Sequence, residues 1–148
     1  MAIVRKATDK EIEKILTYSL DVFKESTLGL FQPNVEKVQQ MVAPVFLNGG
    51  YYLIYEKNNR IQGWIGVGTL YDNLSEEMIG VIPELYVLPS YRNQGIAERL
   101  CKKAIQNLQL DGYKKVQLNV FSKNHARKLY DKLGFREVIT VMEKDLDQ

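Results

Sequence analysis

Cysteine, histidine and proline are scarce in this chain of 148 residues, which contains one cysteine, one histidine and four prolines. Because Cys101 is alone, no disulfide can form within the chain, which fits a reducing compartment. We therefore expect a cytoplasmic protein. Cys101 falls on the apolar face of an expected helix, which favours a buried core thiol over a reactive one.

Long apolar runs and a strong net charge are also missing. No run of about 18 apolar residues is present, and no apolar stretch follows the early charges Arg5 and Lys6. We expect neither a membrane span nor a signal peptide, and no membrane partner. The net charge is +2, and Lys102–Lys103 and Lys114–Lys115 are isolated pairs, so no nucleic-acid partner is indicated.

The length and the pattern of elements indicate a single α/β domain over residues 1–148. A chain of this size buries about 68–70% of its unfolded surface, so one core suffices without metal or disulfide staples, and we expect no metal. The residue patterns predict strands over 3–7, 51–55, 61–70, 78–88 and 115–121, and a last strand or strand pair over 135–144. They predict helices over 9–25, 94–110 and 122–133, and a further helix with Val35, Val38, Val42 and Val45 on one face.

Prolines and turn residues mark where the elements break. Pro33 lies in a break between the first two helices, and Pro44 should end or kink the second helix. Asn58-Asn59 is the expected turn of a hairpin. Pro83 stands inside a strand, where proline is confined to edges and bulges, so this strand should lose a ladder bond there.

Two glycines, Gly66 and Gly68, share one face of the 61–70 strand with Trp64. Glycine inside a strand marks a bulge or the close approach of another group. The missing side chains leave room on the Trp64 face. A ligand or a neighbouring part of the protein would fill that room, and both interpretations stay open.

The most informative stretch runs from Glu84 to Ala97, where a buried strand, a polar turn and a helix start follow one another. A basic, glycine-containing turn at a helix N-terminus suits a phosphate, because free backbone N–H groups and the helix dipole favour an anion. A helix N-terminus that merely faces water is the competing interpretation. The turn is neither a P-loop nor a three-glycine dinucleotide motif.

Two motifs together resemble the GCN5-related N-acetyltransferase (GNAT) superfamily. The stretch Arg92-Asn93-Gln94-Gly95-Ile96-Ala97 matches the family's acyl-CoA pyrophosphate loop, Arg/Gln-x-x-Gly-x-Gly/Ala. The later stretch Leu129-Tyr130-Asp131-Lys132-Leu133-Gly134-Phe135 matches the family's Leu-Tyr-x-Lys-x-Gly-Phe signature. The two motifs stand in the family's order, and the element order matches over nearly the whole chain.

The resemblance implies a mixed, mostly antiparallel sheet with helices on both faces and two parallel strands that splay apart at an acyl-CoA cleft. Acetyl-CoA would be the cosubstrate. Its pantetheine arm would pair with the backbone of Leu85 and Val87, and the Val87 amide would polarise the thioester carbonyl. Arg92 would add charge beside the pyrophosphate. The pyrophosphate would lie on the amides of Asn93, Gln94, Gly95, Ile96 and Ala97.

The resemblance also implies catalytic roles for Tyr130 and Glu84. Tyr130 would give a proton to the CoA thiolate, since a phenol of pKa about 10 is a plausible acid for a thiolate of pKa about 8.5. Packing on the core is the competing role of this ring. Glu84 would hold the cationic amine or accept its proton, directly or through water. The competing interpretation is a glutamate at the sheet edge that faces water or pairs with a lysine. For His125, a solvated helix start is favoured over a base.

One position departs from the family pattern. The family usually has an asparagine three residues before the alanine at Ala126, and Lys123 occupies that position here. Asn124 stands one residue later. It would contact the pantetheine or simply cap the helix that follows.

The expected function is direct acetyl transfer from acetyl-CoA to a primary amine of a small molecule or peptide. A non-catalytic acyl-CoA-binding module is the alternative, and the presence of Tyr130 favours the enzyme. An unrelated nucleotide-binding domain is disfavoured by the second motif. The sequence does not identify the acceptor amine, although the acidic residues in the 72–84 region suggest a cationic one. Dimers are common in the family, so a homodimer stays open, but the sequence shows no specific interface.

Overall fold

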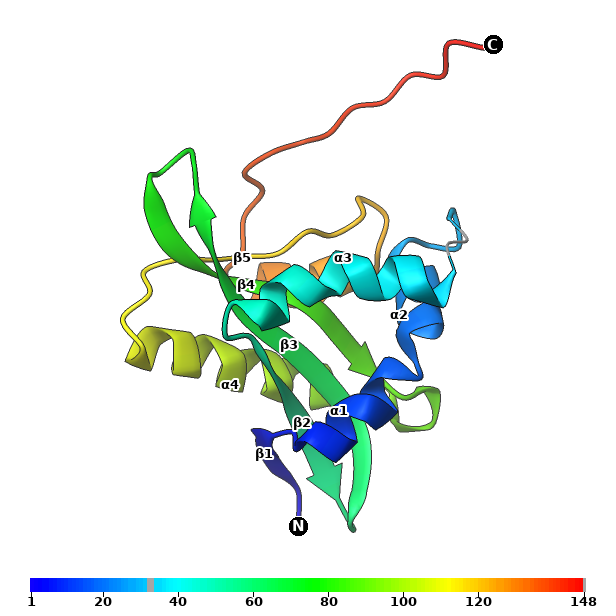
Figure 1. Ribbon diagram of the computed structural model, residues 1–148, viewed down its shortest axis with the longest axis vertical. Coiled ribbons are helices and arrows are strands. Elements are labelled where there is room, and N and C mark those ends of the chain that lie inside the picture. The colour runs from blue at the N-terminus through cyan, green and yellow to red at the C-terminus, as the bar shows by residue number, and fades with distance from the viewer. Residues whose placement is uncertain (32–33, 148) are drawn as a thin grey trace.

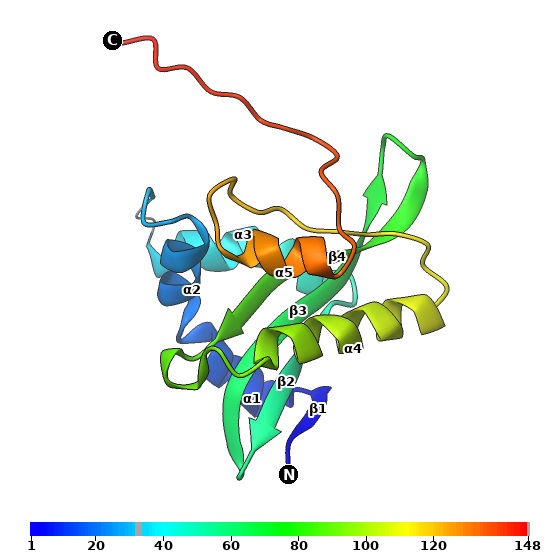
Figure 2. The same ribbon diagram turned by 180° about the vertical axis from the view of Figure 1, so that it is seen from behind.

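The computed structural model describes residues 1–31 and 34–147, so Pro33 lies outside the described residues. In these ranges one sheet of five strands has the order β1-β2-β3-β4-β5, with only the β4–β5 pair parallel. Helices α4 and α5 cover one face, and α1, α2 and α3 cover the other (Figures 1 and 2). The expected α/β class is confirmed. The elements are β1 (Ile3–Lys6), α1 (Asp9–Leu16), α2 (Ser19–Ser26), α3 (Val35–Leu47), β2 (Tyr51–Lys57), β3 (Arg60–Asp72), β4 (Glu77–Val87), the 3-10 turn η1 (Pro89–Tyr91), α4 (Ile96–Leu110), β5 (Val116–Gln117) and α5 (Ala126–Lys132).

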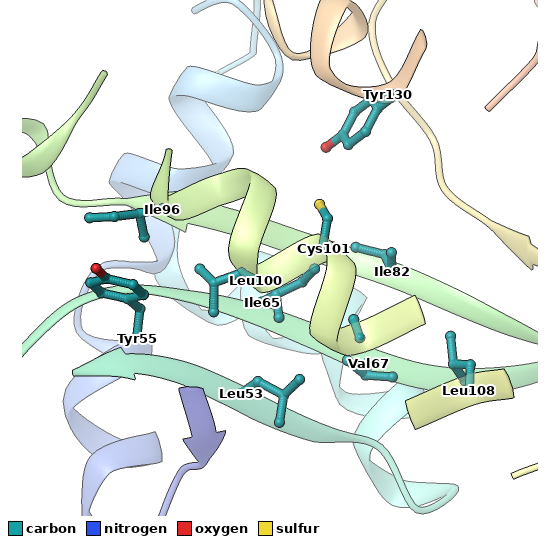
Figure 3. Packing of buried hydrophobic residues seen from close by; sticks show 11 residues of the cluster. Leu53, Tyr55, Ile65, Val67, Ile82, Ile96, Leu100, Cys101, Leu108 and Tyr130 are labelled. Atoms are coloured by element: carbon teal, nitrogen blue, oxygen red, sulfur yellow. The ribbon is translucent and has the colours of Figure 1, made fainter. Parts of the chain in front are cut away.

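The apolar stripe of α4 forms the larger core with the sheet. Its inward side chains are almost completely buried, as the spacing of the sequence predicts, and Cys101 lies among them (Figure 3). Burial raises the pKa of the Cys101 thiol to about 12, so this thiol is a core residue and stays protonated. The buried cluster consists of Leu53, Tyr55, Ile65, Val67, Ile82, Ile96, Leu100, Cys101, Ala104, Leu108 and Tyr130.

Aromatic rings dominate the core on the other face, beneath α1, α2 and α3. Trp64 is 1% exposed and lies between Tyr18 and Tyr86, at centroid distances of 5.4 and 5.3 Å. Tyr52 stacks on Phe46 at 4.5 Å. This layer positions the rings and the carboxyl group of the site described below.

The expected helix over 9–25 is in fact two helices, α1 and α2. A capping box starts α1, with the Glu11 N–H donating to Thr8 Oγ1 at 3.3 Å and the Thr8 N–H to Glu11 Oε1 at 2.9 Å. The helix ends at Thr17, whose hydroxyl and N–H both donate to the Lys14 carbonyl. Tyr18 then leaves helical geometry and packs on Trp64. A tertiary contact therefore overrides the continuous helical spacing.

The turn expected at Asn58-Asn59 is formed, but the second helix does not end at Pro44. Helix α3 continues to Leu47, and a kink at Pro44 stays a prediction. The hairpin turn at Asn58-Asn59 is confirmed, with φ of 53° and 59° at its two residues, the left-handed geometry of a tight hairpin. A Cβ at Gly66 would lie 3.2 Å from the Pro83 ring and 3.6 Å from Tyr52, so a close neighbour fills that room.

The C-terminal expectations are the least accurate. Strand β5 covers only Val116–Gln117, although 115–121 was expected, and the expected strand over 135–144 is not formed. The chain beyond Glu137 instead runs away from the body (Figures 1 and 2). Its apolar side chains are exposed, for example 90% at Val141 and 89% at Met142.

Gly80 allows α4 to pack directly on β4. A Cβ at this position would lie 2.6 Å from Leu108 Cδ1 and 2.8 Å from Cδ2. Gly80→Ala should therefore lower the free energy of unfolding by about 1–3 kcal/mol, the usual range for overpacking. Urea denaturation measures this loss. The second substitution Leu108→Ala should cost less in the Gly80→Ala background than in the wild type, and equal costs would contradict the clash.

Candidate active site

A bulge in β4 coincides with the end of its pairing with β5. Gly66 of β3 pairs with Glu84, whereas Gly68 pairs with Val81. Two residues of β4, Ile82 and Pro83, therefore stand opposite the single β3 residue between the two glycines, which is a β-bulge. The parallel pairing with β5 stops at the same place, with Val81 opposite Gln117 as its last pair. The break in the ladder expected at Pro83 is confirmed as a bulge, and beyond it the two parallel strands are no longer paired.

The edge of β4 beyond its last pair with β5 carries free backbone groups. The Leu88 N–H donates to the Gln62 carbonyl of β3 at 2.9 Å. Because amides alternate along a strand, the N–H groups of Leu85 and Val87 point to the opposite edge. The Val87 carbonyl points there too, and it accepts from Arg92 Nε at 2.9 Å. No acceptor for the Leu85 or Val87 amide is found in the described parts of the chain.

The turn after β4 presents further free amides at the start of α4. Asn93 and Gly95 have left-handed backbones, with φ of 62° and 79°. Gly95 is the N-cap, and no side chain caps the 15-residue helix. The N–H groups of its first turn therefore lack helical acceptors. Together with the helix dipole, they form a concave site suited to an anion.

Arg92 links this turn to α2. Its guanidinium forms a two-point ion pair with Glu25, with Nη2 to Oε2 at 3.0 Å. The same group lies over the Tyr86 ring, 5.3 Å from its centroid. Together with its bond to Val87, these contacts direct Arg92 toward α2 at the end of β4.

Glu84 is enclosed on the aromatic face. Trp64 Nε1 donates to Glu84 Oε2 at 2.7 Å, and Tyr52 forms a second side-chain hydrogen bond with the carboxyl group. Burial raises the pKa of Glu84 from its ordinary 4.5, while the two hydrogen bonds act in the opposite direction. Tyr52, Gly66 and Glu84 stand opposite one another on three neighbouring strands. Since Gly66 has no side chain, Tyr52 reaches Glu84 across it.

Tyr130 lies on the other face, in the α4 core. Its ring contacts Phe135 at 5.6 Å, and its hydroxyl points toward Cys101 (Figure 3). Burial raises the pKa of Tyr130 above its ordinary 10, so the hydroxyl stays protonated at neutral pH. No hydrogen-bond partner of this hydroxyl is found among the described residues. Tyr130 therefore combines the expected core packing with a free donor.

The two other candidates lie at the start of α5. Asn124 Oδ1 accepts from the Ala126 N–H at 2.9 Å, and Asn124 Nδ2 donates to the Ser26 carbonyl at 3.3 Å. Asn124 thus binds the first N–H of α5, although the N-cap itself is His125, and it ties α5 to the end of α2. His125 is exposed at the helix N-cap.

A pocket of about 790 Å³ opens on the Glu84 side of the sheet, between α2 and the end of β4. Tyr18 and Tyr86 supply aromatic walls, and the negative charges of Asp21 and Glu25 are balanced by Lys24 and Arg92. Arg92 lies at its edge and neutralises part of that charge through Glu25.

The sequence did not reveal Tyr52, Trp64, Asp21 or Glu25 as parts of the site. Tyr52 was expected only as a strand residue, and Trp64 only as a residue on the strand face that leaves room for a ligand or a neighbour. A two-residue turn at Asn58-Asn59 would place Tyr52 opposite Ile65. A shift in register at Tyr55/Glu56 places it opposite Gly66 instead. Unless this register shift is known, the sequence cannot show that Tyr52 stands opposite Gly66 and so reaches Glu84.

The family of the chain follows from comparison with known proteins. The model of the acetyltransferase (GNAT) family matches residues 16–135. The matched range is most of the chain and includes β4, the turn and α5. The chain belongs to the acetyltransferase (GNAT) family, as the two motifs implied.

Curated relatives carry similar names. The Escherichia coli protein described as the uncharacterized N-acetyltransferase YjgM is 27% identical over 122 residues, which are 82% of this chain and 69% of that protein. The ribosomal protein bS18-alanine N-acetyltransferase of Haemophilus influenzae is 33% identical over 82 residues, which are 55% of this chain and 52% of that protein. The chain spans about half the length of most of the curated relatives that it matches.

Solved structures show the same fold. A Pyrococcus furiosus structure assigned as an acetyl transferase superposes with a TM-score of 0.81 at 20% identity, covering 99% of this chain and 100% of that one. A Clostridium acetobutylicum structure, assigned as an acetyltransferase and solved with acetyl-CoA, gives 0.75 at 20% identity, covering 99% and 97%. The expected GNAT-like fold is confirmed.

The described residues contain neither a metal-ion cluster nor a membrane-spanning helix. Over 1–31 and 34–147, no group of three or more His, Cys, Asp or Glu side chains is placed to hold a metal ion. No described helix combines the length and the apolar character needed to span a bilayer.

The pKa of Glu84 depends on Tyr52. Removing the Tyr52 hydroxyl in Tyr52→Phe deletes one hydrogen bond that stabilises the carboxylate, so the pKa of Glu84 should rise further. Titration of the Glu84 carboxyl carbon by NMR measures it. The control is Tyr51→Phe, whose hydroxyl meets Asn107 instead. An unchanged or lower pKa in Tyr52→Phe would contradict the arrangement.

The same shift makes stability depend on pH. The folded-state pKa of Glu84 is raised, so its contribution is present below the ordinary 4.5 and is lost as the pH rises through the raised value. In Glu84→Gln, the free energy of unfolding should no longer fall over this pH range.

Proposed function

We propose that this protein is an acetyl-CoA-dependent N-acetyltransferase that acts on a primary amine of a small molecule or peptide. The free edge of β4 carries the proposal. Its Leu85 and Val87 amides lie between the Glu84 carboxyl group on one face of the sheet and Tyr130 on the other. An amide donor, a buried carboxyl group and a phenol are the groups that this transfer requires.

The residues present fit acetyl-CoA. The uncapped start of α4 and the left-handed residues Asn93 and Gly95 suit the pyrophosphate. The open edge of β4 suits the pantetheine amides, which would add to it like a strand. Arg92 would add its charge to the phosphates once it has released Glu25. Asn124 would contact the pantetheine from the start of α5.

Acetyl-CoA would supply the acetyl group as a thioester, so that an amide bond forms, the C–S bond breaks and CoA leaves as the thiol. The Val87 N–H would donate to the carbonyl oxygen, on which negative charge develops during attack. Because β4 holds this amide in the strand, the donor is already oriented. Such donors are worth about 10²–10³ in kcat in other acyl-transfer enzymes.

Glu84 would accept the proton of the attacking amine, directly or through a water molecule. Trp64 and Tyr52 hold its carboxylate in one orientation. Its raised pKa brings the group nearer to neutrality, where a base is most effective. Since only the ionised carboxylate accepts a proton, kcat/KM should increase with pH through the pKa of Glu84.

Tyr130 would give its proton to the departing sulfur. Its hydroxyl has no partner among the described residues and stays protonated, because burial raises its pKa. The amine would approach from the Glu84 face, while the thiol would leave on the Tyr130 face. Acid and base are thus kept apart by the strand edge that holds the acyl group.

A cationic acceptor is the class that the aromatic surface of the pocket favours. Tyr18 and Tyr86 give it rings for a cation, whereas Lys24 and Arg92 balance the negative charges of Asp21 and Glu25. The Haemophilus relative is named for an alanine amine of a ribosomal protein. A peptide N-terminus and a small polyamine therefore both belong in the screen of acceptors.

Release of CoA thiol distinguishes an enzyme from a non-catalytic acyl-CoA-binding module. Acetyl-CoA should raise the Tm under both hypotheses. Release of CoA thiol with any amine of a broad panel supports the enzyme, and binding without release supports the module. No change in Tm would contradict both.

Tyr130→Phe should lower kcat by about 10²-fold, a typical loss for a general acid, with little change in KM for acetyl-CoA. The ring and its packing on Phe135 are kept. Thiol release under saturating acetyl-CoA measures the effect. Tyr113→Phe, in the same core, is the matched control. Unchanged kcat in Tyr130→Phe would rule out its role as acid.

Asp21→Asn should raise KM for a cationic amine by about 2–5-fold, the effect of one surface charge, without changing KM for acetyl-CoA. Steady-state kinetics with a diamine and with a neutral amine of similar size tests this. Asp131→Asn, on the far side of the site in α5, is the control. An equal effect on both amines would contradict a cation-binding pocket.

A further inference from the structure

Lys24 lines the pocket beside α2 and is itself a primary amine. Among the described residues of the pocket wall, it is the one that carries such a group. Its side chain makes no hydrogen bond, ion pair or ring contact within the described ranges 1–31 and 34–147. The pocket that we propose for an acceptor amine therefore already contains an unpaired amine of the chain.

The second cation of the pocket is engaged and cannot act as a nucleophile. Arg92 forms its two-point ion pair with Glu25, and its Nε donates to the Val87 carbonyl at 2.9 Å. A guanidinium does not lose its proton in a protein, whereas a lysine amine can. Of the two cations, only Lys24 can form an amide bond.

The backbone that carries Lys24 is held in place at the end of α2. The Gly29 N–H donates to the Lys24 carbonyl at 2.7 Å, and Asn124 Nδ2 donates to the Ser26 carbonyl at 3.3 Å. Helix α2 ends beside the end of β4 (Figures 1 and 2). The four-carbon stem of the side chain stays flexible on this fixed base, so its amine can reach different parts of the pocket.

The pocket adjoins the carboxyl group that we propose as the base. Its two aromatic walls, Tyr18 and Tyr86, pack on Trp64 at centroid distances of 5.4 and 5.3 Å. Trp64 Nε1 in turn donates to Glu84 Oε2 at 2.7 Å. Glu84 and Tyr86 are two residues apart on β4, so both side chains lie on the same face of the sheet.

We propose that Lys24 is a site of self-acetylation, at which its Nζ attacks the thioester of acetyl-CoA bound to the same chain. The N–C bond of an amide forms and the C–S bond breaks. Glu84 receives the proton of the amine, directly or through a water molecule, and Tyr130 gives a proton to the departing sulfur. The proposal rests on the proposed function, because it uses the same cosubstrate and the same two groups.

Self-acetylation changes the charge of the pocket. An acetylated Lys24 is neutral, so the pocket wall then carries Asp21 and Glu25 against Arg92 alone. One negative charge is left in excess, which favours a cationic amine over a neutral one. The modification would therefore set the acceptor preference of the enzyme.

Incubation of the full chain with acetyl-CoA and no added amine, followed by intact-mass and peptide mass spectrometry, tests the proposal. Lys24 should gain an acetyl group at least about ten times faster than Lys10, an exposed lysine of α1 outside this pocket, because an amine held beside the thioester reacts at a higher effective concentration. Lys24→Arg should abolish this fast uptake, whereas Lys10→Arg should keep it. No acetyl group at Lys24, or equal rates at the two lysines, would overturn the proposal.

The kinetics of the wild-type chain test whether the transfer occurs within one chain, and they need no substitution. At saturating acetyl-CoA, the rate constant should stay the same over an about tenfold range of protein concentration. A rate constant that rises with protein concentration would mean transfer between chains and would overturn the proposal. Tyr130→Phe should slow the modification by about 10²-fold, and an unchanged rate would instead indicate spontaneous acetylation.

Thiol release with the amine panel, measured on the same preparation, separates this proposal from the proposed function. If added amines are acetylated while Lys24 stays unmodified, self-acetylation is wrong and the enzyme stands. If neither Lys24 nor any amine is acetylated, both are wrong.

Discussion

The bulge at Ile82–Pro83 is the constraint on which the rest of the site depends. Proline has no N–H to give to a ladder, and the extra residue ends the parallel pairing between β4 and β5. The second half of β4 therefore keeps one edge unpaired while β3 holds the other. That edge is rigid and polar, and the helix N-terminus of α4 follows directly at its end. A continuous ladder would have left no place for a ligand.

The same strand separates two proton-carrying groups by its two faces. Glu84 faces an aromatic layer that encloses it and provides Trp64 and Tyr52 as donors. Tyr130 faces the α4 core, which keeps its hydroxyl protonated. Burial raises both pKa values, but the consequences differ, since it makes the carboxylate a better base and keeps the phenol a donor. Arg92 links the turn after β4 to the wall of the pocket beside α2 through its ion pair with Glu25.

Local rules predicted the elements whose cause is local. The stripe of α4, the Asn58-Asn59 turn and the bulge at Pro83 follow from spacing, turn chemistry and the missing N–H of proline. The break at Tyr18 could not be predicted, because the ring leaves the helix to pack on Trp64 from another element. The partner of Glu84 was hidden for a similar reason, since a register shift in β2 decides which side chain stands across Gly66. The strand expected over 135–144 has strand composition, but composition does not name its partner.

The central claim is that the Leu85 and Val87 amides bind the acyl-CoA arm while the start of α4 binds its phosphates. Titration of the ¹⁵N-labelled protein with acetyl-CoA, followed through its amide resonances, tests this most directly. The largest shifts should occur at Leu85, Val87 and the residues from Asn93 to Ala97, and amides of β4 that point toward β3 should shift less. Saturable binding that leaves Leu85, Val87 and the turn unchanged would contradict the claim.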